Sequence, residues 1–456
     1  MKVCDSALAK RDIAYHLHPQ TNLRVHEQVG PLLIERGEGI YVFDEQGKRY
    51  IEGMSGLWCA TLGFSQPRLA EAAYAQMLKL PYQQTFAHRS HGPAADLAAQ
   101  LIAHAPAGLH KVVFQSSGSE AIDTAIKFVR YYHIALGKPG KTRLIARERS
   151  YHGTTIAAAT LTGLPNMHKG WGGSQADVIH VRCPHLYRQG LPGETEEDFS
   201  TRLANELEHT ILEAGPETIG AFFAEPVMGT GGVIVPPSGY FAKVQAVLRK
   251  YDILLVADEV ICGFGRTGHY WGCEAMGIQP DMLTCAKGLS AAFQPISALL
   301  LSDRIYQVIA DQSNALGGLG HGYTYGGHPV AAAVALETLH LYDELEIVEH
   351  VARVSVAFQT GIQAFADHPL VGEARGIGLM AALEFVADKQ TREPFPPALK
   401  VATQVSNVLQ RNGLLLRALG DTLVMAPPLI VDAEQIQTIL NAVAQALDEV
   451  LAGIRP

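Results

Sequence analysis

Short apolar segments alternate with longer amphipathic segments from about residue 95 to residue 325. The apolar segments have the length of strands, and the segments between them carry the 3.6-residue spacing of helices. Apolar strands separated by helices form mainly parallel sheets that are covered on both faces. The sequence therefore predicts an α/β fold with a mainly parallel seven-stranded sheet, whose strands are expected at residues 111–114, 143–146, 178–181, 220–223, 253–257, 282–285 and 296–301.

The two ends of the chain follow a different pattern. Alternating runs at 39–44 and 49–52 flank a turn at 45–47 and predict an antiparallel hairpin. Beyond residue 330, helices and shorter strands lead to a long helix expected at 432–451. We therefore expect a large domain at 61–328 and a small α+β domain at 329–456, which the N-terminal segment 1–60 joins.

Charge and spacing exclude several classes of protein. The net charge of −9 and the lack of a basic run argue against a nucleic-acid partner. Apolar stretches fall short of the roughly 20 residues of a membrane span, and the N-terminus lacks the apolar core of a signal peptide. The cysteines and histidines lack the close spacing of metal or redox motifs. We expect a cytoplasmic protein without a metal or a membrane partner.

Three glycine-containing segments resemble phosphate-binding motifs. Ser117, Gly118 and Ser119 follow a predicted strand and open a helix, where free N–H groups and the helix dipole attract an anion. The segment 135–142 is close to a P-loop but follows a helix and opens a strand. The segment 263–268 matches GxGxxG, yet no helix follows it at once. Only the first segment predicts a phosphate site.

Several polar or aromatic side chains come directly after predicted strands. Lys287 follows the strand at 282–285, and Asp258 follows the strand at 253–257. Such an amine can form a Schiff base with the aldehyde of pyridoxal phosphate (PLP), and such a carboxylate can keep the pyridinium nitrogen protonated. Tyr151, after 143–146, can stack on a flat ring, and Glu225 follows 220–223. These strand ends predict one pocket at one edge of the sheet.

These residues resemble the class III PLP-dependent aminotransferases, which have the aspartate aminotransferase fold (PLP-dependent transferase fold type I). The resemblance rests on the segments 255–260 and 263–268, on Ala286-Lys287-Gly288, and on 322–329. It implies that Lys287 carries the Schiff base and moves the proton, and that Asp258 pairs with the pyridinium nitrogen.

The resemblance also assigns the rest of the cofactor site. Tyr151 and Val260 would pack on the two faces of the ring. Gly118 and Ser119 would hold the phosphate together with Thr324, which reaches the cofactor of the partner subunit. The resemblance thus implies a homodimer or a tetramer.

The substrate class depends on a departure from one branch of that family. Ornithine-type members carry an arginine where this chain has Val424, which argues against an ordinary α-amino-acid donor. Arg417, Trp58 and Phe86 resemble instead the pocket of amine:pyruvate (ω-) transaminases. That group implies ping-pong transfer from a primary amine or ω-amino compound to pyruvate. The alternatives are a decarboxylase or racemase of the same fold, a class III aminotransferase that uses 2-oxoglutarate, and a purely structural role for the two aromatic residues.

Overall fold

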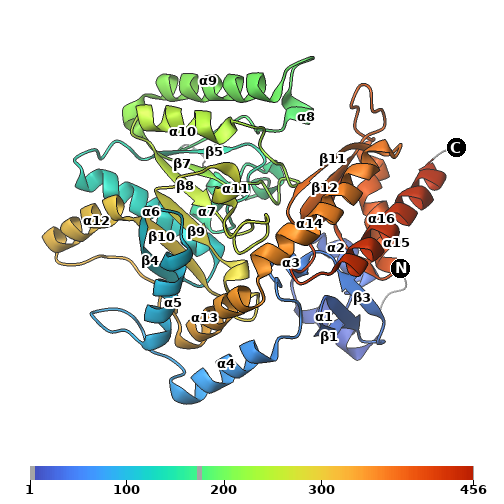
Figure 1. Cartoon of the computed structure of the whole chain (residues 1–456), viewed down its shortest axis with the longest axis horizontal. Coiled ribbons are helices and arrows are strands. Elements are labelled where there is room, and N and C mark those ends of the chain that lie inside the picture. Colours follow the sequence, from blue (N-terminus) through green and yellow to red (C-terminus); the bar gives the residue numbers. More distant parts are fainter. Residues whose placement is uncertain (1–5, 172–176, 455–456) are drawn as a thin grey trace.

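The computed structural model describes residues 6–171 and 177–454 and is built around one seven-stranded sheet (Figure 1). The strand order is β4-β10-β9-β8-β7-β5-β6; β10 is antiparallel to both neighbours, and the other neighbouring pairs are parallel. The strands are β4 (Leu109–Gln115), β5 (Arg143–Arg147), β6 (Val178–Val181), β7 (Ile219–Ala224), β8 (Leu254–Asp258), β9 (Met282–Cys285) and β10 (Ser297–Ser302). All seven predicted strands are confirmed, each within two residues at either end.

Helices cover both faces of this sheet, and β8 shows how the sequence arranges it. Leu254 and Val256 pack into one apolar cluster, whereas Leu255 and Ala257 pack into the other. Because both faces are buried, the strand is apolar from Leu254 to Ala257 and ends at Asp258. The first cluster includes α6 (Gly118–Ala135), α7 (Ile156–Leu161) and α12 (Asp303–Leu316); the second includes α5 (Gly92–His104), α9 (Glu196–Ala214), α10 (Tyr240–Lys250) and α13 (Pro329–Glu344).

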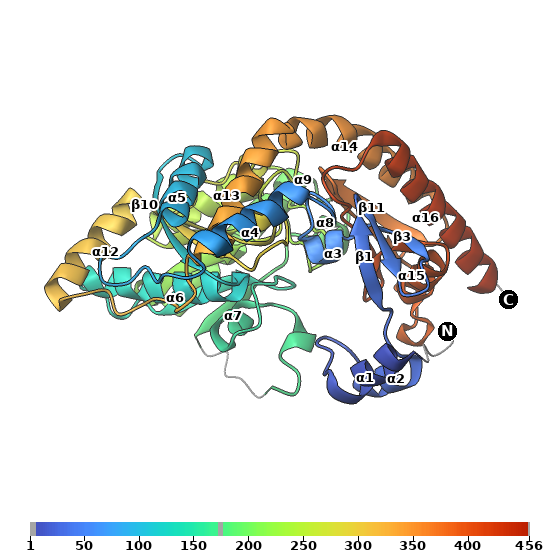
Figure 2. The same ribbon diagram turned by 90° about the horizontal axis from the view of Figure 1, so that it is seen from below.

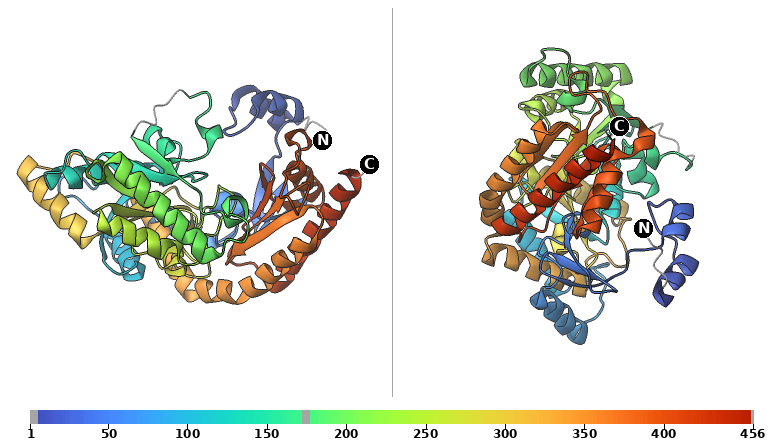
Figure 3. Two further views of the ribbon diagram at one scale, coloured as in Figure 1. Left: turned by 90° about the horizontal axis from the view of Figure 1, so that it is seen from above. Right: turned by 90° about the vertical axis from the view of Figure 1, so that its right-hand side faces the viewer.

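Two smaller sheets lie beside the central one. The first is antiparallel, in the order β11-β12-β15-β14: β11 (Val371–Ile377), β12 (Met380–Phe385), β15 (Thr422–Met425) and β14 (Arg417–Leu419). The long helices α14 (Ile347–Ala364) and α16 (Ala433–Ile454) run along its outer side, with α15 (Val401–Arg411) next to α16 (Figure 3). The predicted final helix is confirmed as α16.

The second small sheet joins the two ends of the chain. The predicted hairpin is confirmed as β2 (Tyr41–Asp44) and β3 (Arg49–Glu52), and an additional strand, β1 (Ile34–Glu38), pairs with β2. β13 (Leu414–Leu415) comes from the C-terminal part and pairs in parallel with β3. The N-terminal segment therefore shares a sheet with the C-terminal part, while the three domain boundaries stay predictions.

The remaining helices connect these layers. They are α1 (Ala7–Tyr15), α2 (Leu23–Val29), α3 (Ser55–Trp58), α4 (Pro67–Lys79), α8 (Leu186–Gln189) and α11 (Gly272–Met276). The P-loop-like segment 135–142 ends α6 and leads into β5, as expected, and 263–268 forms turns between β8 and α11. None of the helices within the described residues combines the length and apolar character needed to cross a membrane.

Candidate active site

A cavity of about 150 Å³ lies at the ends of β5, β7, β8 and β9 and at the start of α6. Eleven residues line it, and seven of them were predicted from the sequence as site residues. The predicted residues are Gly118, Ser119, Tyr151, Glu225, Asp258, Val260 and Lys287; the others are His152, Gly153, Ile261 and Ala286. The strand ends therefore converge in one pocket, as the sequence predicted.

Lys287 begins a short 3-10 helix, Lys287–Ser290, and only Ala286 separates it from the end of β9. Its φ of 49° is left-handed, a conformation that costs a non-glycine residue about 1–3 kcal/mol and is found mainly at functional sites. Burial lowers the pKa of Lys287. Within the described residues its amine makes no hydrogen bond or ion pair with another side chain. A larger fraction of the amine is therefore neutral and able to act as a nucleophile or base.

Asp258 is buried and held from three sides. One carboxylate oxygen lies 2.7 Å from Nδ1 of His152, and the other accepts a hydrogen bond of 3.1 Å from the backbone N–H of Val260. The hydroxyl of Thr284 donates to it over 3.4 Å. His152 was not predicted as a site residue, although it follows Tyr151 directly in the sequence. Its ring fixes the orientation of the carboxylate that faces the cavity.

Glu225 anchors the loop that carries Tyr151. Its carboxylate accepts hydrogen bonds from the backbone N–H groups of Tyr151 (3.1 Å) and Gly229 (3.0 Å). Burial raises the pKa of Glu225, so its proton is lost less readily than from an exposed glutamate. The geometry gives Glu225 a structural task, the placement of the aromatic side chain over the pocket.

The first turn of α6 forms the anion-binding end of the cavity. Ser117 caps the helix by accepting from the N–H of Glu120 (3.3 Å). A Cβ added to Gly118 would lie 3.2 Å from both methyl groups of Val260, and one added to Gly153 would lie 2.5 Å from the Ser119 hydroxyl. Gly153, whose φ of 133° is also left-handed, therefore has no room for a side chain, and at Gly118 any side chain would press on Val260.

Together these groups fit the predicted cofactor. PLP needs an amine for its aldehyde, a carboxylate for its ring nitrogen, a flat apolar slot and an anion site at a helix N-terminus. Lys287, Asp258, the slot between Tyr151 and Val260, and the start of α6 supply each of these around one cavity.

Besides Ser117, which caps α6, four other predicted residues do not line this cavity. Trp58 is 2% exposed and belongs to the apolar cluster of Ile261 and Val424, directly behind the pocket wall. Phe86 is 46% exposed and packs against Gly322, on a separate surface hollow. Thr324 is exposed, and its carbonyl accepts a hydrogen bond of 2.9 Å from the Tyr82 hydroxyl.

Arg417, the fourth, begins β14 at the edge of the small sheet and is half-buried. Burial lowers its pKa, while the neighbouring Tyr151 acts in the opposite direction. Among the described residues the guanidinium forms no hydrogen bond and no ion pair. A permanently charged group is thus held near the cavity without a carboxylate to neutralise it.

Comparisons with a family model, with curated proteins and with solved structures all match this chain to aminotransferases. Residues 23–447 match the family model described as aminotransferase class-III. The tomato (Solanum lycopersicum) protein named gamma aminobutyrate transaminase 1, mitochondrial, is 50% identical over 422 residues, covering 92% of this chain and 82% of that protein.

Solved structures of omega transaminases match more completely. The omega transaminase from Pseudomonas jessenii in complex with PMP is 51% identical, with a TM-score of 0.97 over 99% of this chain and 100% of that one. A thermostable omega transaminase variant, W58M/F86L/R417L, engineered for asymmetric synthesis of enantiopure bulky amines, is also 51% identical, with a TM-score of 0.96 over 98% of this chain and 99% of that one.

Proposed function

The chain belongs to the class-III aminotransferase family, and we propose that it moves the amino group of a primary amine or ω-amino compound to pyruvate by ping-pong half-reactions. Its cofactor is PLP, which supplies an electron-withdrawing ring that stabilises negative charge on the substrate carbon.

The residues of the cavity divide the work. Lys287 would hold the aldehyde carbon of the cofactor and, once replaced by substrate, would move a proton at the substrate carbon. This proton transfer needs a neutral amine, which the lowered pKa of Lys287 favours. Asp258, fixed by His152, would keep the ring nitrogen protonated through its negative charge. The N–H groups at the start of α6, with Ser119, would hold the phosphate.

The guanidinium of Arg417, which has no hydrogen-bond or ion-pair partner among residues 6–171 and 177–454, is the observation that carries the substrate assignment. A guanidinium binds a carboxylate through two parallel hydrogen bonds, and a half-buried one without an internal partner is ready to bind a keto acid. Val424, where ornithine-type enzymes carry arginine, is buried in an apolar cluster instead. Arg417 thus offers a carboxylate clamp and the Val424 position offers none, which suits an amine without an α-carboxylate.

The comparisons support the same substrate class. The engineered omega transaminase variant was changed at Trp, Phe and Arg residues numbered 58, 86 and 417, and this chain has the same three residue types at Trp58, Phe86 and Arg417. The name of the tomato relative concerns γ-aminobutyrate, which is an ω-amino compound. Both kinds of relative support an amino group remote from an α-carboxylate.

A homodimer would complete the phosphate site. Thr324 is exposed in its own chain and has exposed apolar neighbours: Tyr82 donates to its carbonyl, and the ring of Tyr82 contacts that of Tyr325. Phe86 and Leu319, also exposed, line the hollow that contains Gly322. Exposed apolar patches of this kind mark protein–protein interfaces. We propose that this patch is buried against a second copy, which places Thr324 at the partner's cofactor. The cytoplasmic location stays a prediction.

A donor and acceptor panel tests the proposed reaction. Purified PLP-loaded enzyme would be assayed with a primary arylalkylamine, γ-aminobutyrate and ornithine, each against pyruvate and 2-oxoglutarate. We expect turnover with the first two donors, pyruvate as the better acceptor, and little transfer from the α-amino group of ornithine. Preference for 2-oxoglutarate would contradict the proposed acceptor and favour the alternative class III activity.

A further inference from the structure

Three histidines and one aspartate gather on the N-terminal arm, which comprises α1, α2 and the turn between them (Figure 2). None of these four side chains lines the cofactor cavity. The side chains Asp12, His16, His18 and His26 are called the Asp12 cluster. One oxygen of Asp12 lies 3.1 Å from Nδ1 of His16. Its other oxygen lies 2.7 Å from Nε2 of His18 and 3.4 Å from Nε2 of His26.

Local structure brings these side chains together. Asp12 and His16 are four residues apart at the end of α1, where the N–H of His16 donates to the carbonyl of Asp12 (2.9 Å), so both side chains lie on one face. The chain then turns at Gln20, whose φ of 55° is left-handed, and α2 returns His26 to the same place. The ring of His18 lies 4.5 Å from that of His16 and 4.0 Å from that of His26.

His26 gives an independent indication of a ligand. Its side chain is about nine-tenths buried, and its Nε2 makes no hydrogen bond within the described residues. An unpaired buried polar atom costs about 1–3 kcal/mol and calls for an explanation. This nitrogen points at the same oxygen of Asp12 that His18 contacts, in poor alignment for a hydrogen bond but in a suitable place for a shared ion.

The spacing and the donor types match one class of metal. Tetrahedral zinc, with bonds of about 2.0–2.2 Å, holds its ligand atoms about 3.4 Å apart. The ligand atoms of Asp12, His16 and His18 all lie within 4.8 Å of one another, and His26 is adjacent. Imidazole nitrogens suit Zn²⁺, whereas Mg²⁺ and Ca²⁺ require shells of oxygen. We propose that the Asp12 cluster binds Zn²⁺, with His16 as the outermost ligand.

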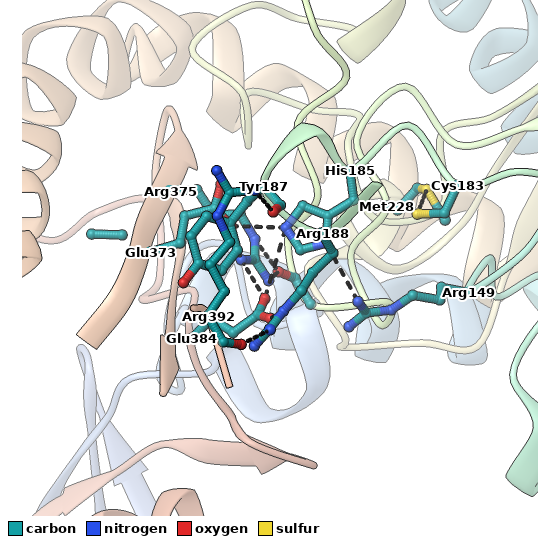
Figure 4. A network of polar contacts seen from close by, with 12 residues as sticks. Arg149, Cys183, His185, Tyr187, Arg188, Met228, Glu373, Arg375, Glu384 and Arg392 are labelled. Atoms are coloured by element: carbon teal, nitrogen blue, oxygen red, sulfur yellow. Dashed lines mark hydrogen bonds and ion pairs between the residues drawn. The ribbon is translucent and has the colours of Figure 1, made fainter. Parts of the chain in front are cut away.

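A second group with metal-ligand side chains, His185, Glu373 and Glu384, differs in its surroundings (Figure 4). Arg375 bonds to both carboxylates, at 2.7 Å from Glu384, and Arg188 donates to Glu384 as well. A cation there would face two guanidinium groups that already neutralise the carboxylates. This group instead ties the loop before α8 to β11 and β12.

Bound zinc would hold in place the turn through which the arm contacts the rest of the chain. The side-chain amide of Gln20 contacts the sulfur of Met167 at 3.5 Å, so the turn inside the Asp12 cluster touches the segment after α7. A metal that links α1 to α2 would hold this turn in place. Arg11 and Arg24, two trypsin sites, flank the turn and report on its order.

Titration with Zn²⁺ tests the proposal. Untagged, PLP-loaded full-length enzyme would be freed of metal by chelation, dialysed and titrated with zinc chloride in a calorimeter. We expect one Zn²⁺ per chain, absent or at least roughly tenfold weaker in His18→Gln and His26→Gln. The matched control is His209→Gln, an exposed histidine 3.1 Å from Glu213 with the same i, i+4 spacing, and its binding should equal that of wild type. Unchanged transaminase activity shows that the variants are folded.

Limited proteolysis gives a second, independent measurement of Zn²⁺ binding to the arm. Zn²⁺, but not Mg²⁺, should slow tryptic cleavage after Arg11 and Arg24 in wild type and leave His18→Gln unprotected. Absence of Zn²⁺ binding in wild type, or equal binding in wild type and both cluster variants, overturns the proposal. Equal cleavage rates with and without Zn²⁺ would show that any bound ion does not hold the turn in place.

Discussion

Replacing Arg417 with alanine should damage one half-reaction and spare the other. The guanidinium is half-buried and unpaired within the described residues, so its removal leaves no other side chain without a partner. If it binds the carboxylate of pyruvate, the variant loses a charge-assisted contact worth about 1.5–3 kcal/mol. At about 1.4 kcal/mol per decade, kcat/KM for pyruvate should fall roughly ten- to a hundredfold.

Stopped-flow absorbance of the bound cofactor measures each half-reaction separately. Arg417→Ala should slow the reaction of the amine-loaded enzyme with pyruvate, and it should leave the reaction of the PLP form with an uncharged-tailed amine nearly unchanged. Arg417→Lys should recover only part of the loss, because an ammonium lacks the planar fork of a guanidinium. Arg411→Ala is the control, since that exposed arginine pairs with Glu449 at 2.6 Å on the outer helices.

Two results would refute this reasoning. Equal losses in both half-reactions would make Arg417 a structural residue. No loss in either would mean that the keto-acid carboxylate is bound elsewhere, and the proposed substrate class would lose its main support.

Four further outcomes follow from the same geometry. Lys287→Ala should abolish transamination while PLP still binds through the phosphate site, and near wild-type turnover of the purified variant would disprove the role of Lys287. Asp258→Asn should slow proton transfer in both half-reactions without unfolding the chain. His152→Asn should slow it less, because the His152 ring only orients Asp258. Wild-type rates for both variants in rapid-mixing assays would argue against a contact between Asp258 and the ring nitrogen. Tyr325→Asp, in the exposed patch around Thr324, should shift sedimentation toward monomer and weaken PLP retention, whereas Leu212→Asp on α9 should do neither. Burial raises the pKa of Glu259 from 4.5 to about 7, so the folded state favours the protonated form; the stability that this proton contributes is full below pH 4.5 and is lost as the pH rises through about 7. Thermal unfolding of wild type should therefore shift downward between these pH values more than that of Glu259→Gln, and parallel shifts would contradict this.

The central sheet was predictable because its chemistry is local. Strands such as β8 are buried on both faces and read as unbroken apolar runs, and the strand ends of a parallel sheet necessarily meet at one edge. β1 escaped prediction because its sequence, Ile34–Glu38, is largely charged and exposed, and it is held by pairing with β2 rather than by an apolar face. β13 has only two residues and no periodicity to detect.

The parts of the site that were missed depend on contacts between distant segments. His152 meets Asp258 across 106 residues of sequence, so no local spacing reveals that hydrogen bond. The absence of a metal site was predicted from missing helical motifs, yet the Asp12 cluster forms through a turn between two helices. Phe86 and Thr324 lie outside the cavity of their own chain, and the predicted role of Thr324 depends on a second subunit.

The most direct test of the account is a single turnover with the purified PLP-loaded enzyme and an amine donor alone. We expect each active site to convert one PLP to pyridoxamine phosphate and one amine to its carbonyl product. Pyruvate added afterwards should restore PLP and yield one equivalent of alanine. Consumption or racemisation of the donor without any pyridoxamine phosphate would contradict it and would favour decarboxylase or racemase chemistry on the same fold.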